Sequence, residues 1–330
     1  MGERLAWRRA YIWAMLAFLL GMPLFVKSPY HLHVLIMVGL NTVLAASLAL
    51  IVRTGQISFA HPAFMAIGAY TSTVLVTEVG LSYWLALVMA CLAAGFVALL
   101  VGYPILRVKG AYFFLVTFAF LEIIRLIVTY FKHPFGGSRG LVRIPAPKID
   151  LPGLLTVEFA VGGTHFYYLM IFLAVLSLFV LYRVEKGYYG RAFRAIAQND
   201  TLAESLGINP MKCKLLAFVL GCFFAGLVGA FYAPYFTFIN PRCFTLTTSI
   251  LIIIYVIVGG MGRITGAVVG AVVLTILPEV LRATGYYEMM IFAVLLILVV
   301  MFLPDGLISL PSRVLSRGLS RGARIGSETS

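Results

Sequence analysis

The sequence predicts an all-α, polytopic integral membrane protein with about ten transmembrane helices and both termini in the cytoplasm. The 330 residues are 62% hydrophobic and only 11% charged, whereas a typical soluble domain has roughly 25% charged residues. The apolar residues form repeated long runs, and the basic residues lie in the loops between them. A soluble chain of this length could not bury so much apolar surface, which argues against a soluble enzyme, a nucleic-acid-binding module or a disordered protein.

Ten apolar runs approach the length of about 20 residues that a helix needs to cross a bilayer. They are residues 10–26, 32–52, 57–77, 84–106, 111–131, 165–182, 213–238, 246–261, 265–282 and 286–303. The first run resembles a signal peptide, but no small-residue cleavage site follows it, so we expect a retained span. Runs 57–77 and 246–261 are interrupted or bounded by Gly, Pro and Ser, so either could be a broken or re-entrant helix.

The basic residues predict the orientation, because cytoplasmic loops carry an excess of Lys and Arg. If the N-terminus is cytoplasmic, 17 of the 25 Lys and Arg residues lie in cytoplasmic loops, seven lie in external loops, and Arg125 lies within a span. An even number of spans returns the C-terminus to the cytoplasm. We therefore expect one transmembrane domain over residues 1–310 and a basic, disordered tail over 311–330.

Two connections are long. The external loop 132–164 contains ten Gly or Pro residues, so we expect mostly turns, with room for a short hairpin at 154–160. The cytoplasmic loop 183–212 is polar and carries helix signals. Its first short helix is expected over 191–198, where the Asn-Asp pair at 199–200 ends it.

A second short helix is expected directly after this pair. Thr201 and Glu204 form a T-x-x-E capping box, and Gly207 suits the C-terminal stop. Asn209 before Pro210 fits the N-cap and first residue of the next transmembrane helix. The loop is therefore expected to be a rigid cytoplasmic platform. A segment lying on the lipid surface is the alternative, which the lack of a large hydrophobic face disfavours.

The sequence contains no sign of enzyme chemistry. It has no Gly-Lys dipeptide, so a Walker A loop is impossible. The five histidines show no metal-ligand spacing, and no Ser/His/Asp set can be assembled. The four cysteines form no CxxC pair, so we expect free thiols and no metal site.

Charged residues inside a membrane are pointers to function, and here they are few. Glu122 and Arg125 lie three residues apart on one face of a predicted span. They are either a neutralising pair that fixes helix packing or a polar spot on a translocation path. Glu279 and Arg282 repeat the spacing near an external end, where packing is the simpler interpretation.

Glycine spacing is the third signal. Gly259, Gly260 and Gly262 form a turn between two spans, and Gly262, Gly266 and Gly270 then repeat every four residues. Small residues at this spacing let helices approach closely in lipid, and the turn indicates irregular backbone near a cavity. The segment from Gly55 to Pro62 is similar, because a helix that restarts at Pro62 could present free backbone amides to an anionic group.

Several motifs together resemble one known family over about residues 30–310. They are GQISFAHPAFMAIGAY at 55–70, KGAYFFLVTFAFLEIIRLIV at 109–128, GGSRGL at 136–141, GRAFRAIAQNDTLAESLGIN at 190–209, INPRCFTL at 239–246, VGGMGRITGAVVGA at 258–271 and FLPDGL at 302–307. The chain resembles the membrane permease subunits of branched-chain amino acid ABC transporters, of the LivM type. It departs from the usual pattern at Ala60, Pro62, Phe135 and Arg139, which bears on the substrate more than on the class.

The resemblance implies a permease subunit in a bacterial or archaeal cytoplasmic (inner) membrane. Its implied partners are a second homologous permease, two ATPase subunits, a periplasmic or extracellular substrate-binding protein and membrane lipid, but no nucleic acid. The partners would use ATP, with no cofactor bound directly to this chain. Loop 183–212 would couple it to an ATPase, and transport would follow alternating access. The coupling residues expected are Gly190, Arg191, Arg194, Ala195, Asp200, Glu204 and Gly207.

Residues expected to line the path or to fix helix packing come from three regions. They are His61, Pro62, Glu122, Arg125, Gly259, Gly260, Gly262, Gly266 and Gly270. Relatives of this family carrying urea, amides or other small acids are the alternative for the substrate. A secondary transporter or channel is the alternative class, although it would need no docking platform and usually has more intramembrane ionisable groups.

Overall fold

The computed structural model describes residues 21–23, 28–108, 110–151, 155–158, 163–303 and 306–309. The predicted span 10–26 lies outside the described residues except for a helical stretch at 21–23. The predicted tail 311–330 also lies outside them. Each of the later apolar runs contains one helix, so the prediction of an all-α polytopic protein is confirmed for the described part of the chain.

The helices are named by their bounds. They are α2 (Pro29–Val52), α3 (His61–Thr77), α4 (Tyr83–Leu106), α5 (Ala111–Tyr130), α6 (Thr164–Lys186), α7 (Tyr188–Gln198), α8 (Asp200–Ser205), α9 (Pro210–Phe236), α10 (Leu246–Gly259), α11 (Ile264–Leu281) and α12 (Glu288–Phe302). Short 3-10 turns occupy Gly137–Arg139, Pro241–Cys243, Arg282–Tyr287 and Leu307–Ser309. Among the described residues, seven helical segments are long and apolar enough to cross a membrane.

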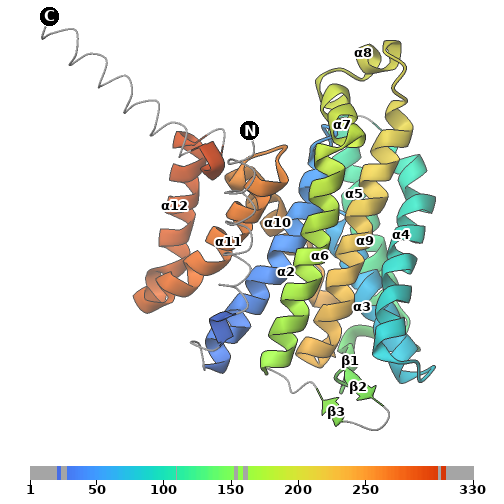
Figure 1. Cartoon of the computed structure of the whole chain (residues 1–330), viewed down its shortest axis with the longest axis vertical. Coiled ribbons are helices and arrows are strands. Elements are labelled where there is room, and N and C mark those ends of the chain that lie inside the picture. The colour runs from blue at the N-terminus through green and yellow to red at the C-terminus, as the bar shows by residue number, and fades with distance from the viewer. Residues whose placement is uncertain are drawn as a thin grey trace, which may run out of the picture.

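Helix α9 lies at the centre of the bundle, where it packs against α2, α3 and α4. A Cβ on Gly68 of α3 would collide with the backbone carbonyl of Gly226 on α9. The two helix backbones therefore touch, which is how small residues favour helix association in lipid. Helices α11 and α12 lie to one side of the bundle (Figure 1), where α11 packs against α2 and α10.

The external loop supplies the described strands. Strands β2 (Lys148–Leu151) and β3 (Leu155–Glu158) form an antiparallel hairpin, so the hairpin expected at 154–160 has its second strand there. Strand β1 (Leu141–Val142) pairs instead with β4 (Phe238–Ile239), which follows α9. The strands β1, β2 and β3 lie at the end of the bundle opposite α7 and α8 (Figure 1).

Two details of the cytoplasmic loop differ from the predictions. Helix α7 begins at Tyr188 rather than at residue 191, because Gly190 packs against the backbone of Glu185 instead of breaking the helix. The predicted capping box is also wrong. Asn199 is the N-cap of α8, since its side chain accepts hydrogen bonds from the backbone N–H groups of Thr201 and Leu202.

Of the two runs that could be broken, 57–77 has a non-helical start, whereas 246–261 forms one uninterrupted helix. Helix α3 begins only at His61, so the segment from Gly55 to Ala60 is not helical. Helix α10 has 14 residues and ends at Gly259. Local chemistry also fixes the start of α9 as expected, because the side chain of Asn209 accepts a hydrogen bond from the backbone N–H of Lys212 and Pro210 follows it.

Candidate functional site

The platform consists of α7 and α8 at one end of the bundle (Figure 1). Phe193 and Ile196 of α7 are buried against the bundle, whereas Arg191 and Arg194 on the other face are exposed. Leu202 in α8 and Leu206 directly after it are also exposed, by 62% and 73%. Such a mixed apolar and basic surface is typical of a protein–protein docking site.

The platform ends in a sharp turn at Gly207. Its φ of +82° is left-handed, and no other atom would crowd a Cβ placed there. Glycine is required at this position for its backbone conformation rather than for space. The predicted helix stop at Gly207 is therefore confirmed as a local structure.

One buried arginine connects the platform to three transmembrane segments. Arg53, directly after α2, forms an ion pair with Glu185 of α6, and their side chains are only 5% and 6% exposed. Its Nε donates a hydrogen bond of 3.2 Å to the carbonyl of Gly190 in α7. Its Nη1 donates another of 2.7 Å to the carbonyl of Gly262, between α10 and α11. Burial lowers the pKa of the Arg53 guanidinium, although the nearby Glu185 carboxylate partly offsets this by favouring the charged form.

Sequence reasoning missed this connection. Arg53 was counted only as one of the cytoplasmic basic residues, and Glu185 was not singled out. The two residues lie 132 positions apart, so no local spacing relates them. An acidic residue beside a predicted span end was the available signal, because such a residue needs a basic partner when it is buried.

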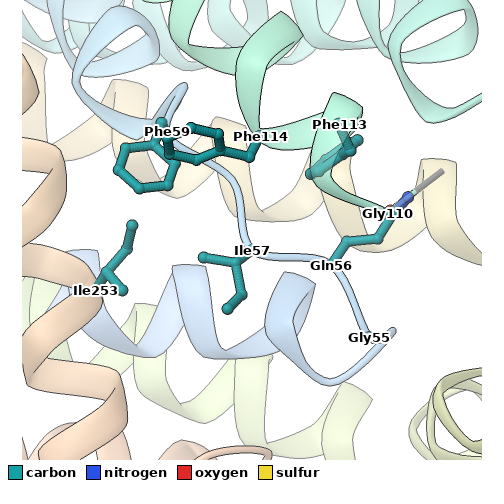
Figure 2. A pocket seen from close by; sticks show the side chains of 8 residues that line it. All are labelled: Gly55, Gln56, Ile57, Phe59, Gly110, Phe113, Phe114 and Ile253. Carbon is teal, nitrogen blue, oxygen red and sulfur yellow. The ribbon is translucent and has the colours of Figure 1, made fainter. Parts of the chain in front are cut away.

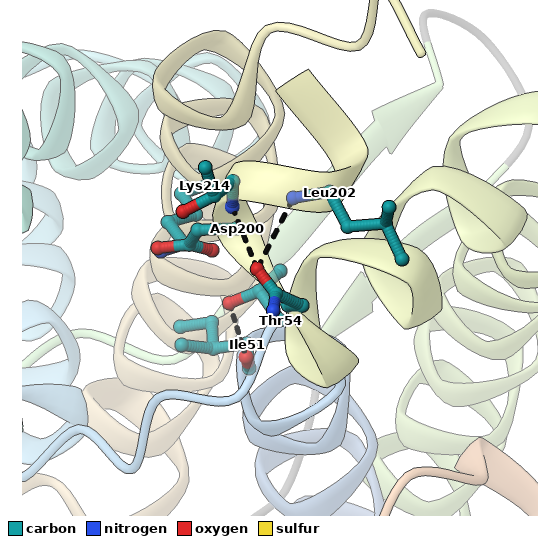
Figure 3. Close-up of polar contacts among 7 residues, drawn as sticks. Ile51, Thr54, Asp200, Leu202 and Lys214 are labelled. Atoms are coloured by element: carbon teal, nitrogen blue, oxygen red, sulfur yellow. Dashed lines mark hydrogen bonds and ion pairs between the residues drawn. The ribbon is translucent and has the colours of Figure 1, made fainter. Parts of the chain in front are cut away.

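A second ion pair fastens α8 to α9. Lys214 Nζ lies 2.6 Å from Asp200 Oδ2, and the lysine side chain is 10% exposed. Figure 3 shows Asp200 and Lys214 facing each other beside Thr54 at the end of α2. The Thr54 hydroxyl donates to the carbonyl of Ile51. Asp200, expected to serve coupling, therefore holds the platform against the membrane helices.

An apolar pocket of about 410 Å³ lies beside the non-helical segment before α3 (Figure 2). It is lined by Gly55, Gln56, Ile57, Phe59, Gly110, Phe113, Phe114 and Ile253. The Phe59 and Phe114 rings meet edge to face at 4.3 Å between centroids. Ser249 of α10 donates to the Phe59 carbonyl, and the Phe59 N–H donates to Thr117 of α5. These hydrogen bonds hold the irregular backbone against α5 and α10.

A second pocket, of about 330 Å³, lies between this segment and the platform. We call it the platform pocket. Gly55, Gln56 and Gly110 line both pockets, and Thr54, Lys214 and residues 196–201 complete the platform pocket. The wall between the two pockets is therefore formed by Gln56 and its glycine neighbours.

The predicted pair His61 and Pro62 lies inside the bundle. His61 is 1% exposed and its Nε2 lies 3.1 Å from the hydroxyl of Ser47. Both residues are buried at the start of α3 and are absent from the lining of the apolar pocket. His61 therefore anchors the first turn of α3 against α2.

Glu122 and Arg125 form the expected ion pair on α5, with Arg125 Nε 2.8 Å from Glu122 Oε2. Their side chains are 28% and 32% exposed on this chain, so the pair is not enclosed. Glu122 lies roughly 12 Å along α5 from Phe114 at 1.5 Å per residue, beyond the apolar pocket. Glu279 and Arg282 are paired at 3.5 Å, and the arginine is 64% exposed.

The expected glycines bring α10 and α11 into backbone contact. A Cβ on Gly259 would collide with the Gly266 carbonyl, and a Cβ on Gly270 would collide with the Tyr255 carbonyl. Gly260 and Gly262 have φ values of +125° and +78° in the turn between the helices. The Gly262 carbonyl accepts from Arg53, so this turn is attached to the platform.

Comparisons with known proteins place the chain among permeases. The family described as "Branched-chain amino acid transport system / permease component" matches residues 30–300. The permease protein LivM of Escherichia coli (strain K12) is 31% identical over 88% of this chain and 71% of its own length. The permease protein LivH of Salmonella typhimurium is 26% identical over 78% of this chain and 87% of its own. The probable permease protein LivM of Methanocaldococcus jannaschii is 25% identical over 67% and 68%. No solved structure matches the chain.

Proposed function

Because this chain belongs to the branched-chain amino acid transport system permease family, we propose that it forms part of the path through which an ABC importer moves branched-chain amino acids. It is a multi-pass membrane subunit and not an enzyme. A second homologous permease completes the path, two ATPase subunits supply the energy, and an external binding protein delivers the substrate. The cytoplasmic (inner) membrane of a bacterium or archaeon is its location.

The lining of the apolar pocket supports the assignment of branched-chain amino acids as the substrate. Ile57, Phe59, Phe113, Phe114 and Ile253 contribute five large apolar side chains. An aliphatic side chain gains free energy by leaving water for such a site, whereas urea and amides need polar walls to replace their hydrogen bonds with water. Branched-chain amino acids therefore fit better than the alternative substrates.

The exposed ion pair on α5 supports the position of the path. Charged side chains within a membrane do not face lipid tails without a large penalty. Glu122 and Arg125 are about 30% exposed on the isolated chain, so their face of α5 is covered by the second permease or by water in the path. The path then runs along α5, past the pair and down to the apolar pocket.

The platform of α7 and α8 is the docking site for an ATPase subunit. Arg191 and Arg194 can reach acidic groups, and Leu202 and Leu206 supply apolar contact area. When the ATPases close, the platform moves, and Arg53 carries the movement to α2, α6 and the turn between α10 and α11. The apolar pocket lies beside the segment that follows Arg53, between α5 and α10, so it opens alternately to the two sides.

The topology follows from the same placement. The platform is cytoplasmic because basic residues concentrate on its side of the membrane. The strands at the opposite end of the bundle are then external. Ten spans, with 10–26 as the first, return the C-terminus to the cytoplasm. The short α3 and the irregular segment before it together cross the bilayer.

Copurification followed by transport tests the proposal. The tagged chain is purified from its own membrane, and the proteins bound to it are identified. We expect a second permease and ATPase subunits. The complex is reconstituted in liposomes, and its binding protein is added outside. Complexes whose ATPase subunits face the lumen should accumulate radiolabelled leucine only when ATP is enclosed in the lumen. A chain that purifies without ATPase subunits, or uptake driven by an ion gradient without ATP, would contradict the proposal.

A further inference from the structure

Gln56 carries a buried polar atom that the fold leaves unused. The residue is 9% exposed, and its side-chain carbonyl oxygen has no hydrogen-bond partner among the described residues. A buried acceptor without a donor destabilises a folded protein, because the group has lost its hydrogen bond to water and gained none. Thr42 Oγ1 on α2 is also buried without a partner, but Thr42 is not among the residues that line either pocket.

Gln56 lies where its carboxamide can reach a solute, although the carbonyl oxygen is itself enclosed by protein and must turn about the Cγ–Cδ bond to meet a donor. Gln56 lines the apolar pocket and the platform pocket at once. In Figure 2 its side chain extends from the irregular segment toward Gly110, away from Ile57 and Phe59. Any solute that leaves the apolar pocket toward the platform must therefore pass this carboxamide.

The missing partner is a hydrogen-bond donor, which defines the chemistry of the ligand. An amino acid has an ammonium group with three donors, and among the residues that the structure describes no acidic side chain lines the apolar pocket to receive it. The start of α5 also borders this pocket at Gly110, Phe113 and Phe114, and the N-terminal end of a helix favours a carboxylate. A neutral acceptor holds an ammonium less tightly than a carboxylate does, which suits a site that must release its ligand.

We propose that Gln56 binds the α-ammonium group of the transported amino acid and forms the cytoplasmic exit of the apolar pocket. The aliphatic side chain lies against Ile57, Phe59 and Phe114 while the Gln56 oxygen accepts from the ammonium. Gln56 is thereby a specificity-determining residue that requires an amino group on the solute. This inference rests on the proposed function, since it takes the substrate to be an aliphatic amino acid.

The proposal is tested by comparing the binding of two ligands, with and without an ammonium group, to three variants of the protein. The ligands are radiolabelled leucine and 4-methylpentanoate, which has the same carbon skeleton without the ammonium. Equilibrium binding is measured on the assembled permease–ATPase complex in lipid nanodiscs without the binding protein. The protein variants are wild type, Gln56→Met, which keeps the side-chain length, and Thr42→Val, a control that removes a different unpartnered oxygen away from the pockets.

We expect wild type and Thr42→Val to bind leucine about tenfold to a hundredfold more tightly than 4-methylpentanoate, the range for a hydrogen bond to a charged group. In Gln56→Met this preference should fall to about twofold or less, with 4-methylpentanoate binding unchanged. Equal binding of both ligands to wild type, or a preserved preference in Gln56→Met, overturns the assignment. So does a wild-type complex that takes up leucine without measurable binding.

The proposed function has a separate control. Uptake of leucine by the wild-type complex is measured in the same preparation with the binding protein and ATP. If wild type does not transport leucine, the proposed function fails. If wild type transports leucine and Gln56→Met transports it equally well, only the role of Gln56 fails.

Discussion

Removal of the Glu185 carboxylate tests the connection between the platform and the membrane helices. The substitution Glu185→Gln keeps the size of the side chain and leaves the Arg53 guanidinium charged and buried. Removing one partner of a buried ion pair costs about 3–5 kcal/mol, and both side chains here are at most 6% exposed. Two backbone carbonyls continue to accept from Arg53. We therefore expect the lower end, a loss of about 3 kcal/mol in the free energy of unfolding.

The assay is reversible unfolding in mixed micelles with increasing SDS, followed by circular dichroism. Glu279→Gln is the matched control, because Glu279 pairs with an arginine that is 64% exposed; no measurable change is expected. The double variant Arg53→Met, Glu185→Leu should lose less stability than Arg53→Met or Glu185→Leu alone, since it leaves no unpaired buried charge. A Glu185→Gln variant as stable as wild type, or additive losses in the double variant, would refute the reasoning.

The other predictions concern the platform, the path and the topology. Gly207→Val should abolish ATP-driven leucine uptake in liposomes while membrane insertion is unchanged, because a β-branched residue is strained at φ +82°; Gly207→Asn, which tolerates that backbone, should retain uptake. Reversing the charge of Arg191 and Arg194 together should remove the substrate-stimulated ATPase activity of the complex; normal stimulation would exclude the platform as the coupling element. Glu122→Gln should reduce uptake but change the unfolding free energy by only about 1 kcal/mol, since the pair is partly exposed; a loss of several kcal/mol with normal uptake would mean that it serves packing. Reporter fusions at Gly163 and at the C-terminus should read external and cytoplasmic, and equal readings would refute the topology.

The features predicted correctly depend on interactions close in sequence. Apolar runs define helices because a bilayer demands both length and continuous hydrophobicity. The start of α9 follows from Asn209 and Pro210, whose roles are set within one helical turn. The cap of α8 was assigned to Thr201 rather than Asn199 because two adjacent residues could each cap the helix, and the choice depends on where α7 ends.

The features that the sequence did not reveal depend on contacts between distant segments. The apolar pocket combines the irregular segment with Phe113 of α5 and Ile253 of α10. Hydropathy shows that each of these residues is apolar and says nothing of which helices are neighbours. The same holds for Arg53, whose partners Glu185 and Gly262 come from other helices.

The irregular segment before α3 has a consequence for biosynthesis. The backbone N–H and carbonyl of Phe59 are satisfied by Thr117 and Ser249, which the ribosome adds 58 and 190 residues later. Until then, these peptide groups have no protein partner, and exposing them to lipid tails costs several kcal/mol each. The nascent chain therefore holds this stretch in contact with water or the insertion machinery. The segment reaches its final position in the bilayer only after α10, which contains Ser249, has left the ribosome.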